Sequence, residues 1–484
     1  MLSSASRHLR RCVGNPSPIE GKNGSRPVAN QAVAVGVGLL AVAAVFLVFT
    51  SVSPARPTSP IACPRGTVHA VAGGKAVCLK TGRTCSRKFE RVYSRFGFHC
   101  RNGRLRNRKV LLTIGGPDQV VYDSSQSGCG PGDWPDGDVV AFRDASGQVQ
   151  VILPSIYLNR RLVGPDLNHL THDCTVTLNS NQNPDPSMYD NGQWLAAVYP
   201  AGNTVYGLTH MEYVGARFPG MCPTQGFDSP DWIRCWWNTI TLVVSTDGGT
   251  SYHRVPMRSG LVGALPYRYD RSGVGFEGMA LNGITQIVRN PADGYFYTIS
   301  GDAVAATSQT EGAAYQCLMR TRNLADPTSW RGWSGKGFTR TFVDPYREST
   351  TPASAHRCQP LNNFPNSGNN LSLSWSTALN RWLGVFQNVA GGYWFTTSPD
   401  LTTWAKPQKF LDRPNPWGVK CGEANEATYS SVLDPSSKSP NFTTTGSSPY
   451  FYFSQFDLSW PSCDRRVFGD IRLVRIPLSV RYSK

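Results

Sequence analysis

The sequence predicts an all-β protein whose main domain is a five-bladed β-propeller, preceded by an N-terminal transmembrane helix and a small disulfide-rich module. Two observations point to the propeller. A turn of the form Ser-x-Asp-x-Gly-x-Ser-aromatic spans residues 245–252, and weaker relatives span 323–330 and 398–404. Short strand signals fill the region around these turns, and a recurrent turn indicates repeated sheets.

The turn at 245–252 has a structural explanation. The Asp247 side chain can accept backbone N–H bonds within the reversal, and glycine allows positive φ. The aromatic residue that ends the turn packs between adjacent sheets. We therefore assign Asp247 to the architecture and give it no catalytic role.

Residues 110–484 contain β-branched and aromatic runs bounded by Gly, Asn, Asp and Pro, without a long amphipathic helical period. Examples of these runs are 138–143, 148–153, 194–199, 240–245, 381–386, 450–454 and 471–476. At about 75 residues per unit, the region would hold five blades. A twin β-sandwich is the structural alternative, but it leaves the recurrent turn-to-aromatic ends unexplained.

An apolar run without a charge occupies residues 32–49. As a helix it would span about 27 Å, close to one bilayer core. Basic residues precede it, and the positive-inside rule therefore places the N-terminus in the cytoplasm. We expect a cytoplasmic tail at 1–31, a transmembrane signal anchor at 32–52 and a Pro/Ser linker at 53–62. The protein would then be a single-pass type II membrane protein with an extracellular or lumenal C-terminal domain; a cleaved signal peptide, which would make it secreted, is the alternative.

Cysteine usage fits an oxidising compartment beyond the membrane. Of 13 cysteines, Cys12 precedes the apolar run, which leaves an even number after it. Four lie in residues 63–109, and the others are spread through 110–484. No Cys-x-x-Cys or paired-His spacing predicts a zinc site. Sequons at Asn370 and Asn441 would suit a glycoprotein.

The net charge of +16 is concentrated in the first 109 residues. Residues 61–109 carry 13 Lys/Arg and one Glu, whereas residues 110–484 carry 29 Lys/Arg and 30 Asp/Glu. Nucleic acid is therefore not an expected partner of the large domain. The basic Cys-rich module, residues 63–109, is either a solvated spacer or a binding site for acidic polysaccharide or anionic headgroups. Its segments 78–85 and 93–105 resemble a short Cys-rich segment found ahead of exported enzyme domains, which implies little about chemistry.

Several segments resemble the five-bladed propeller glycosidases around glycoside hydrolase family 43, namely 183–187, 398–404, 429–435 and 450–453. Others are similar to an uncharacterised exported group of that propeller class, namely 207–213, 317–322, 330–338 and 344–346. The resemblance implies hydrolysis by carboxylates at an axial pit: an Asp base, a second Asp that tunes the acid, and a Glu acid. The segment 475–477 also mimics an Arg-Ile-Pro segment of sialidases, but it follows the turns instead of preceding them and is interpreted as an edge strand.

Inner strands of a propeller supply the groups of an axial pit, so site candidates should lie at blade starts. The candidate catalytic residues are Asp173, Glu212, Glu277 and Glu426. The candidate substrate-binding residues are Asp185, His210 and Arg320. His210 and Glu212 alternate on one strand and share a face, which suits a proton donor beside an oriented imidazole.

Each of the other candidates also has a structural explanation. Asp173 can cap a turn, and Asp185 can belong to an ordinary Asn-Pro-Asp-Pro turn. Glu277 and Glu426 can be solvated loop residues. Arg320 can clamp an acidic sugar or brace a blade edge.

We expect a membrane-anchored, exocytoplasmic glycoside hydrolase-like protein that acts on a cell-surface or wall polysaccharide. A non-catalytic, lectin-like propeller is the alternative, because 13 Trp and 19 Tyr supply aromatic faces for sugar stacking. No cofactor is implied, and the sequence leaves open a structural calcium ion at the axis.

Overall fold

A computed structural model describes residues 63–64, 66–130, 132–223, 235–271, 279–304, 313–364, 371–388, 391–415, 426–456 and 471–483. The chain divides into two units, Met1–Pro60 and Ile61–Lys484, and every described residue belongs to the second. The predicted tail, transmembrane segment and linker, residues 1–62, lie outside the described residues. Among the residues that are described, no helix is long and apolar enough to cross a membrane.

The Cys-rich module has a small core of its own. Its elements are β1 (Val68–Ala72), β2 (Lys75–Leu79), η1 (Arg87–Phe89), α1 (Glu90–Arg95), β3 (Phe98–Arg101) and β4 (Arg104–Asn107). The strands form two antiparallel hairpins, β1–β2 and β3–β4. Two disulfides, Cys63–Cys78 and Cys85–Cys100, compensate for the little apolar surface that such a small module buries.

The first blade is a four-stranded antiparallel sheet with the order β10-β9-β8-β7. Its strands are β7 (Val140–Arg143), β8 (Val149–Leu153), β9 (Leu158–Asp166) and β10 (His169–Asn179). All five side chains of β8 are buried, as expected for a strand covered on both faces by neighbouring blades.

The second and third blades belong to one continuous sheet, because β13 and β16 pair in parallel. The second blade comprises β11 (Gly192–Ala201), β12 (Thr204–Val214), β13 (Trp236–Ser245), β14 (His253–Arg254) and β15 (Leu261–Gly263). The third comprises β16 (Met279–Asn282), β17 (Val288–Arg289), β18 (Phe296–Val304), β19 (Ala313–Thr321), β20 (Arg331–Trp333) and β21 (Phe338–Thr341).

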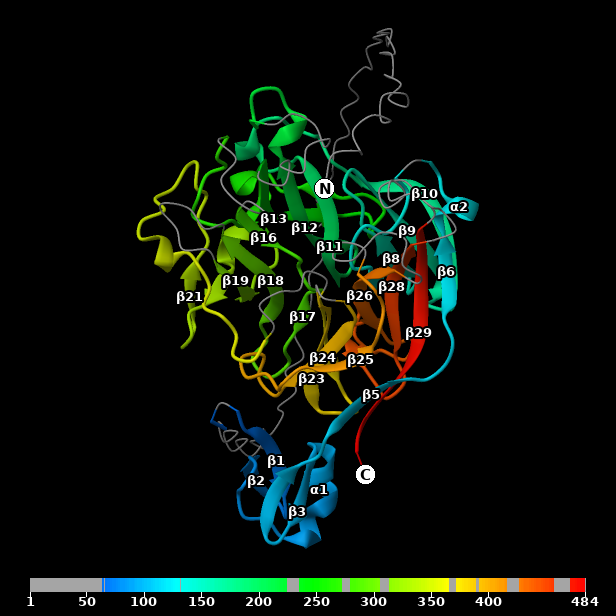
Figure 1. Cartoon of the computed structure of the whole chain (residues 1–484), viewed down its shortest axis with the longest axis vertical. Helices are drawn as coiled ribbons and strands as arrows, with labels where there is room; N and C mark the ends of the chain where they lie inside the picture. The colour runs from blue at the N-terminus through cyan, green and yellow to red at the C-terminus, as the bar shows by residue number, and fades with distance from the viewer. Residues whose placement is uncertain are drawn as a thin grey trace, which may run out of the picture. The chain divides into compact units, whose positions relative to one another are not determined.

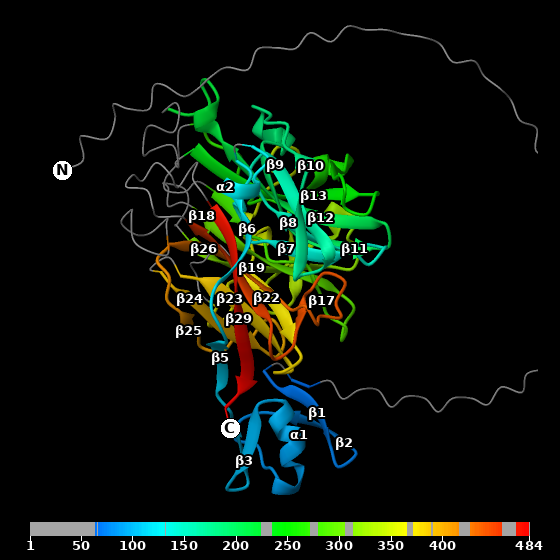
Figure 2. The ribbon, with the colours of Figure 1, turned by 90° about the vertical axis from the view of Figure 1, so that its right-hand side faces the viewer.

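The fourth blade is continuous along the chain, whereas the fifth needs both ends of the propeller sequence. The fourth comprises β22 (Leu371–Ser376), β23 (Arg381–Gln387), β24 (Tyr393–Ser398) and β25 (Gln408–Leu411), with β27 (Thr444–Thr445) added to β22. The fifth comprises β26 (Ala427–Leu433), β28 (Tyr450–Phe456) and β29 (Ile471–Tyr482). β5 (Val110–Ile114) and β6 (Gln119–Asp123) pair with β29 and close the ring (Figures 1 and 2).

These sheets confirm the predicted five-bladed propeller, and the twin β-sandwich alternative is wrong. The strands nearest the axis touch from blade to blade, as shown by contacts of β7 with β11, β17 with β22, and β22 with β26. The segment 475–477 is not an edge strand, because β29 pairs with β28 on one side and with β6 on the other.

Each predicted turn joins a long strand of a blade to the short outer strand that follows it. Residues 245–252 join β13 to β14, residues 323–330 join β19 to β20, and residues 398–404 join β24 to β25. Asp247 accepts the backbone N–H groups of Thr250 and Ser251 at 3.1 and 3.0 Å. The aromatic ends of the turns pack between blades, since Tyr252 lies in a cluster with residues of the first two blades and Trp404 in a cluster with residues of the third and fourth.

Three more disulfides lie in the propeller: Cys129–Cys174, Cys222–Cys235 and Cys317–Cys358. Cys421 and Cys463 lie outside the described residues, as does the sequon residue Asn370. The sequon at Asn441 is not available for glycosylation in the folded chain. Asn441 is 0% exposed, and its Nδ2, the atom that would carry a sugar, donates to the carbonyls of Val198 and Ile287.

Candidate active site

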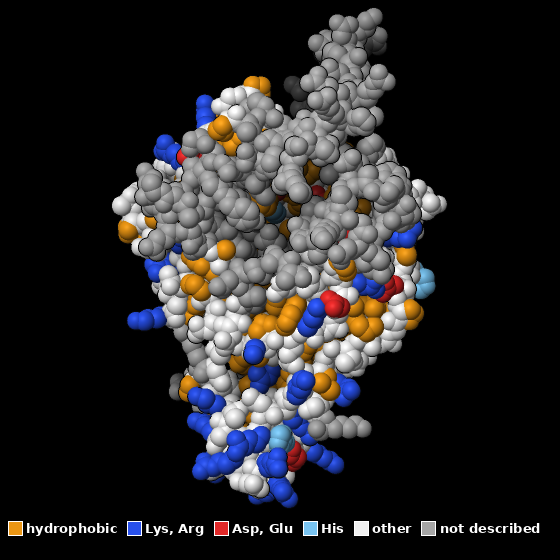
Figure 3. All heavy atoms as spheres, viewed as in Figure 1, with side chains coloured by type: hydrophobic (Ala, Val, Ile, Leu, Met, Phe, Trp, Pro, Cys, Tyr) orange, Lys and Arg blue, Asp and Glu red, His pale blue; other side chains and the backbone are white. Residues whose placement is uncertain are grey.

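The blades present the same strand ends to one face of the ring. In each blade the first strand leaves this face and the antiparallel second strand returns to it. Groups just before a first strand therefore meet groups at the end of a second strand. The carboxylates placed in this way are Asp136 and Asp138 before β7, Glu212 near the end of β12, and Glu426 before β26. Figure 3 shows a hollow at the centre of the propeller in which acidic, imidazole and apolar side chains are visible.

Glu212 and His210 lie on the same face of β12, as the sequence predicted. Trp194 is directly opposite His210 on β11, and their rings stack with centroids 5.3 Å apart. Asn238 on β13 is opposite Glu212. Both Glu212 and His210 are partly buried.

Asp136 is held from two different blades. Its carboxylate accepts the Tyr429 hydroxyl at 2.6 Å and the Trp194 indole N–H at 3.2 Å. Tyr429 belongs to β26 in the fifth blade and Trp194 to β11 in the second, so Asp136 lies where the first blade meets both neighbours. Two donors on one carboxylate fix its orientation and favour its ionised form.

A β-bulge in β26 holds both aspartates of the first blade. The pairing of β26 with β28 shifts register between Thr428 and Ser431, and Tyr429 within this bulge has a φ of 65°. This left-handed backbone costs free energy for a tyrosine. It directs the Tyr429 hydroxyl to Asp136, while the next N–H, that of Ser430, donates to Asp138.

Burial raises the pKa of all three of these carboxyls, but to different extents. Burial raises the pKa of Asp136 to about 6, with the bonds from Tyr429 and Trp194 opposing a larger rise. It raises the pKa of Asp138 to about 7, opposed by backbone N–H bonds. Burial, together with the charge of Asp136, raises the pKa of Glu212 to about 8. At pH 7 Glu212 therefore mostly keeps its proton, while Asp136 is mostly ionised.

The environment of His210 keeps its imidazole neutral. Burial lowers its pKa to about 4, and the neighbouring Asn238 side chain offsets this only in part. A neutral imidazole beside Glu212 places no cation there, so it leaves the Glu212 proton in place.

Two more acidic residues, Glu426 and Asp302, lie near the same face. Glu426 is 1% exposed, and its carbonyl accepts the N–H of Phe456. Asp302, near the end of β18, forms an ion pair with Arg357 at 2.7 Å. Glu426, one of the catalytic candidates predicted from the sequence, lies at the start of the fifth blade.

The structure does not bring Asp173 or Asp185 together with Glu212. Asp173 is on β10, the outermost strand of the first blade, where it pairs with Arg161 at 2.9 Å. Asp185 is exposed and accepts the N–H of Ser187 at the start of the 3-10 turn η2 (Pro186–Met188). Glu277 lies outside the described residues.

Arg320 lies at the end of β19 away from this face. Its guanidinium is within 3.9 Å of the Tyr295 ring centroid and 4.1 Å of that of Phe338. It also donates to the Tyr297 hydroxyl at 3.1 Å. The surroundings of Arg320 thus match the bracing of a blade edge, one of the two roles predicted for it.

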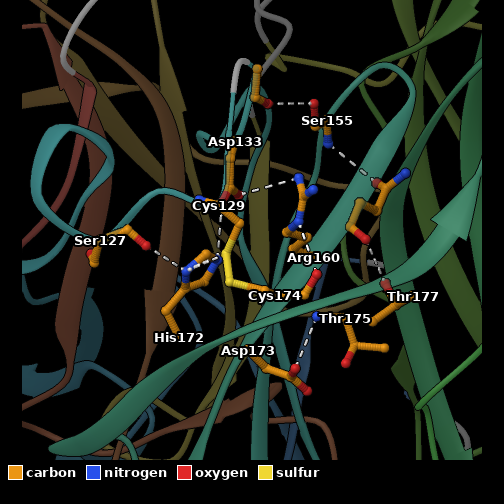
Figure 4. Close-up of polar contacts among 12 residues, drawn as sticks. Ser127, Cys129, Asp133, Ser155, Arg160, His172, Asp173, Cys174, Thr175 and Thr177 are labelled. Carbon is orange, nitrogen blue, oxygen red and sulfur yellow. Dashed lines mark hydrogen bonds and ion pairs between the residues drawn. A yellow bond between two sulfur atoms is a disulfide. The ribbon is translucent and has the colours of Figure 1, made fainter.

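Three side chains of types that often bind metal ions lie close together at the outer strand β10, and a disulfide explains why they do. Cys129, His172 and Cys174 are the one group of this type among the described residues. Figure 4 shows His172 beside the disulfide, with its ring reaching the Ser127 carbonyl, and Asp173 bonded to Thr175. Because the two sulfurs are bonded to each other, they offer no thiolate to a metal ion.

Comparisons with known proteins found likeness only among solved structures. No protein-family model matches the chain, and no curated protein matches it. Zg3597, a family 117 glycoside hydrolase of Zobellia galactanivorans, is 9% identical, with 72% of this chain and 86% of that chain covered and a TM-score of 0.39. The GH43_1 enzyme of Xanthomonas citri, complexed with xylotriose, is 9% identical, with 71% and 86% covered and a TM-score of 0.40.

A third solved structure, the α-L-arabinofuranosidase PaAbf62A of Podospora anserina in complex with cellotriose, is 11% identical. The match covers 76% of this chain and 96% of the arabinofuranosidase chain, with a TM-score of 0.38. The structures similar to this chain include glycoside hydrolases. Assignment of an activity to this chain depends on its own residues.

Asp136, Asp138 and Tyr429 were not predicted from the sequence as site residues. Asp138 opens the run 138–143 that was recognised as a strand and Asp136 lies just before it, so both satisfy the criterion of lying at a blade start. No such signal existed for Tyr429, because its role depends on a bulge and on contact with a residue 293 positions away.

Proposed function

We propose that the propeller is a glycoside hydrolase in which Glu212 is the general acid and Asp136 is the general base. The observation that carries the proposal is the separation of their pKa values, to about 8 and about 6, within one desolvated group of carboxyls. Two neighbouring carboxyls held in opposite protonation states at neutral pH are what acid/base cleavage of a glycosidic bond needs.

In the proposed reaction, ionised Asp136 takes a proton from a water molecule, and the water oxygen attacks the anomeric carbon. The bond from that carbon to the leaving oxygen breaks as Glu212 transfers its proton to the leaving oxygen. Two hydroxyl-bearing products form, and one further proton transfer from Asp136 to Glu212 through solvent restores the site. This chemistry needs no cofactor.

Four neighbouring residues support this pair. Tyr429 orients Asp136 through its hydroxyl, and we assign it as a positioning residue. Asp138, with a pKa raised by burial to about 7, supplies the third carboxyl and tunes the charge of the group. The Trp194 ring stacks on His210 and donates its indole N–H to Asp136, so these two rings hold both sides of the pair in place.

The substrate belongs to a cell-surface or wall polysaccharide, and the protein is a type II membrane protein whose propeller is exocytoplasmic. Support comes from the apolar run at 32–49, the basic residues before it and the five disulfides beyond it. Protease added outside intact cells should digest the propeller while leaving an epitope tag placed before residue 32 intact. Protection of the propeller in that experiment would contradict the topology.

The activity test uses the full chain in neutral detergent, a panel of polysaccharides and mass spectrometry of the released sugars. Glu212→Gln should lower the rate by about 10²–10⁴-fold, because Gln has no proton to give. Glu348→Gln is the matched control, since Glu348 is an exposed glutamate paired with Arg258 and should leave the rate unchanged. Retention on one polysaccharide without any released sugar would replace the hydrolase by a lectin-like propeller.

A further inference from the structure

The hairpin β3–β4 of the Cys-rich module separates its side chains into an apolar face and a cationic face. Register pairs Cys100 with Leu105 and Phe98 with Asn107 on one face, where Phe98, Cys100 and Leu105 are buried in the module core. The opposite face carries His99, Arg101, Arg104 and Arg106. The three arginines on it are exposed. We name these four residues the cationic hairpin face.

The pairing on this face is unfavourable for the hairpin itself. Arg101 is directly opposite Arg104, and His99 is directly opposite Arg106. Like charges directly opposite each other destabilise an antiparallel pair. A two-residue turn at Asn102 and Gly103, both with positive φ, fixes this register, so the arginines cannot slide apart.

Nothing in the described part of the module neutralises this charge. Its single acidic residue, Glu90, accepts the N–H of Cys100 at 2.9 Å. No ion pair involves a cation of the described residues 66–109. By contrast, cations of the propeller have acidic partners, such as Arg161 with Asp173 and Arg413 with Asp118.

The cationic hairpin face is also rigid. The Cys85–Cys100 disulfide attaches β3 to the preceding loop, and Arg104 forms a bridge with Thr84 and donates to the Gly82 carbonyl at 3.2 Å. A preformed array of charges loses less conformational entropy on binding than a flexible basic tail does. Lys and Arg side chains gather over the rest of the module surface as well (Figure 3).

We propose that the cationic hairpin face binds an acidic polysaccharide, one that carries carboxylate or sulfate groups along its chain. Arg side chains recognise such groups with paired N–H donors. The cationic hairpin face carries no Phe, Tyr or Trp on which bases could stack, and no large apolar side chain that could insert into a bilayer. The choice of a polysaccharide over other polyanions rests on the proposed function of the propeller.

The module would then hold an acidic polymer chain independently of hydrolysis. Binding at the cationic hairpin face raises the local concentration of substrate if the same polymer reaches the propeller. It also makes retention strongly dependent on salt, because exposed charges are screened.

The test measures binding of the full chain, in neutral detergent and with Glu212→Gln to prevent cleavage, to immobilised polygalacturonate, heparin and neutral dextran. The variant Arg101→Gln/Arg104→Gln/Arg106→Gln removes three charges from the cationic hairpin face. The control Lys336→Gln/Lys406→Gln/Lys438→Gln removes three charges from exposed lysines of the propeller. We expect the first variant to lose at least tenfold in affinity for an acidic polymer and to bind with a weaker salt dependence, whereas the control changes less than twofold.

Two results would overturn this proposal. One is an equal loss in both triple variants, which would mean that net charge alone determines binding. The other is binding to phosphatidylserine vesicles or duplex DNA without binding to either acidic polysaccharide. Because the measurement does not depend on turnover, its failure is distinct from a failure of Glu212 as the catalytic acid.

Discussion

At the scale of single residues, the protonation states of the buried carboxyls in the hollow depend on a few hydrogen bonds. Asp136 accepts two donors, the hydroxyl of Tyr429 and the indole N–H of Trp194. Burial raises the pKa of both carboxyls, the two donors oppose that rise for Asp136, and the charge of Asp136 adds to the rise for Glu212.

Removing the Tyr429 hydroxyl should therefore move the pH dependence of hydrolysis. In Tyr429→Phe, Asp136 loses a donor that favours its charged form, so its pKa rises above about 6 and the acidic limb of kcat/KM against pH shifts upward. The basic limb, set by Glu212, should stay near pH 8. A pH–rate profile measured at several substrate concentrations checks this expectation.

Tyr297→Phe is the matched control, because Tyr297 also donates to an aspartate, Asp293. This pair lies at the start of β18, which is the end of that strand away from the hollow. The profile of Tyr297→Phe should superimpose on that of the unchanged protein. An acidic limb that is the same in Tyr429→Phe and in the unchanged protein would contradict the role of Tyr429.

At the scale of elements, the outer turns stabilise the blades without taking part in the chemistry. Asp247 accepts three bonds from Thr250 and Ser251 in the turn between β13 and β14. Burial would raise the pKa of Asp247, but bonds from Ser245 and Ser251 outweigh it and lower that pKa to about 2.

Asp247→Ala should lower the free energy of unfolding by about 1–2 kcal/mol while leaving kcat/KM unchanged. Because the folded pKa lies below the unfolded value, the contribution of Asp247 is present above about pH 4 and is lost as the pH falls toward 2. Urea unfolding at pH 7 and at pH 2.5 measures both effects. A difference between variant and unchanged protein that is equally large at pH 2.5 would contradict the electrostatic part of this account.

The turns were predictable from the sequence because their chemistry is local. In the turn at 245–252, Asp247 accepts hydrogen bonds from residues three and four positions later in the same turn. Asp400 likewise accepts hydrogen bonds from Thr402 and Thr403. His210 and Glu212 were predictable for a similar reason, since a strand places residues i and i+2 on one face.

The bulge in β26 could not be predicted in this way. Its identity as a bulge depends on pairing with β28, and its function depends on carboxyls of another blade. Asp173 was chosen from a polar setting that the structure explains by an ion pair with Arg161 on the outer sheet. The local sequence cannot distinguish Asp173 from Asp136 and Asp138, because each is an aspartate beside a predicted strand.

At the scale of the whole molecule, ring closure is what assembles the candidate site. β29 pairs with β28 and with β6, and Arg475 on β29 donates to Gln119 in β6 and to the Leu167 carbonyl between β9 and β10. One side chain thus links the last blade, the closing strand and the first blade.

Arg475→Ala should destabilise the propeller by about 1–3 kcal/mol, because it leaves two buried or partly buried acceptors without their donor. Arg481→Ala, at an exposed position farther along β29, should change stability by less than about 0.5 kcal/mol. The thermal unfolding and the hydrolysis rate of the two variants are measured and compared. Equal effects would mean that Arg475 does not contribute specifically to closure.

The pairing of the propeller's first and last strands also fixes when the site comes into existence during synthesis. Asp136 and Asp138 leave the ribosome early, but the Tyr429 and Ser430 groups that hold them come from the fifth blade, which β29 completes. Without the fifth blade, both aspartates lack these donors. The chain therefore acquires the charge pattern of its hollow only after β29 has been made, and a product that ended before β29 would carry the Cys-rich module without a completed fifth blade.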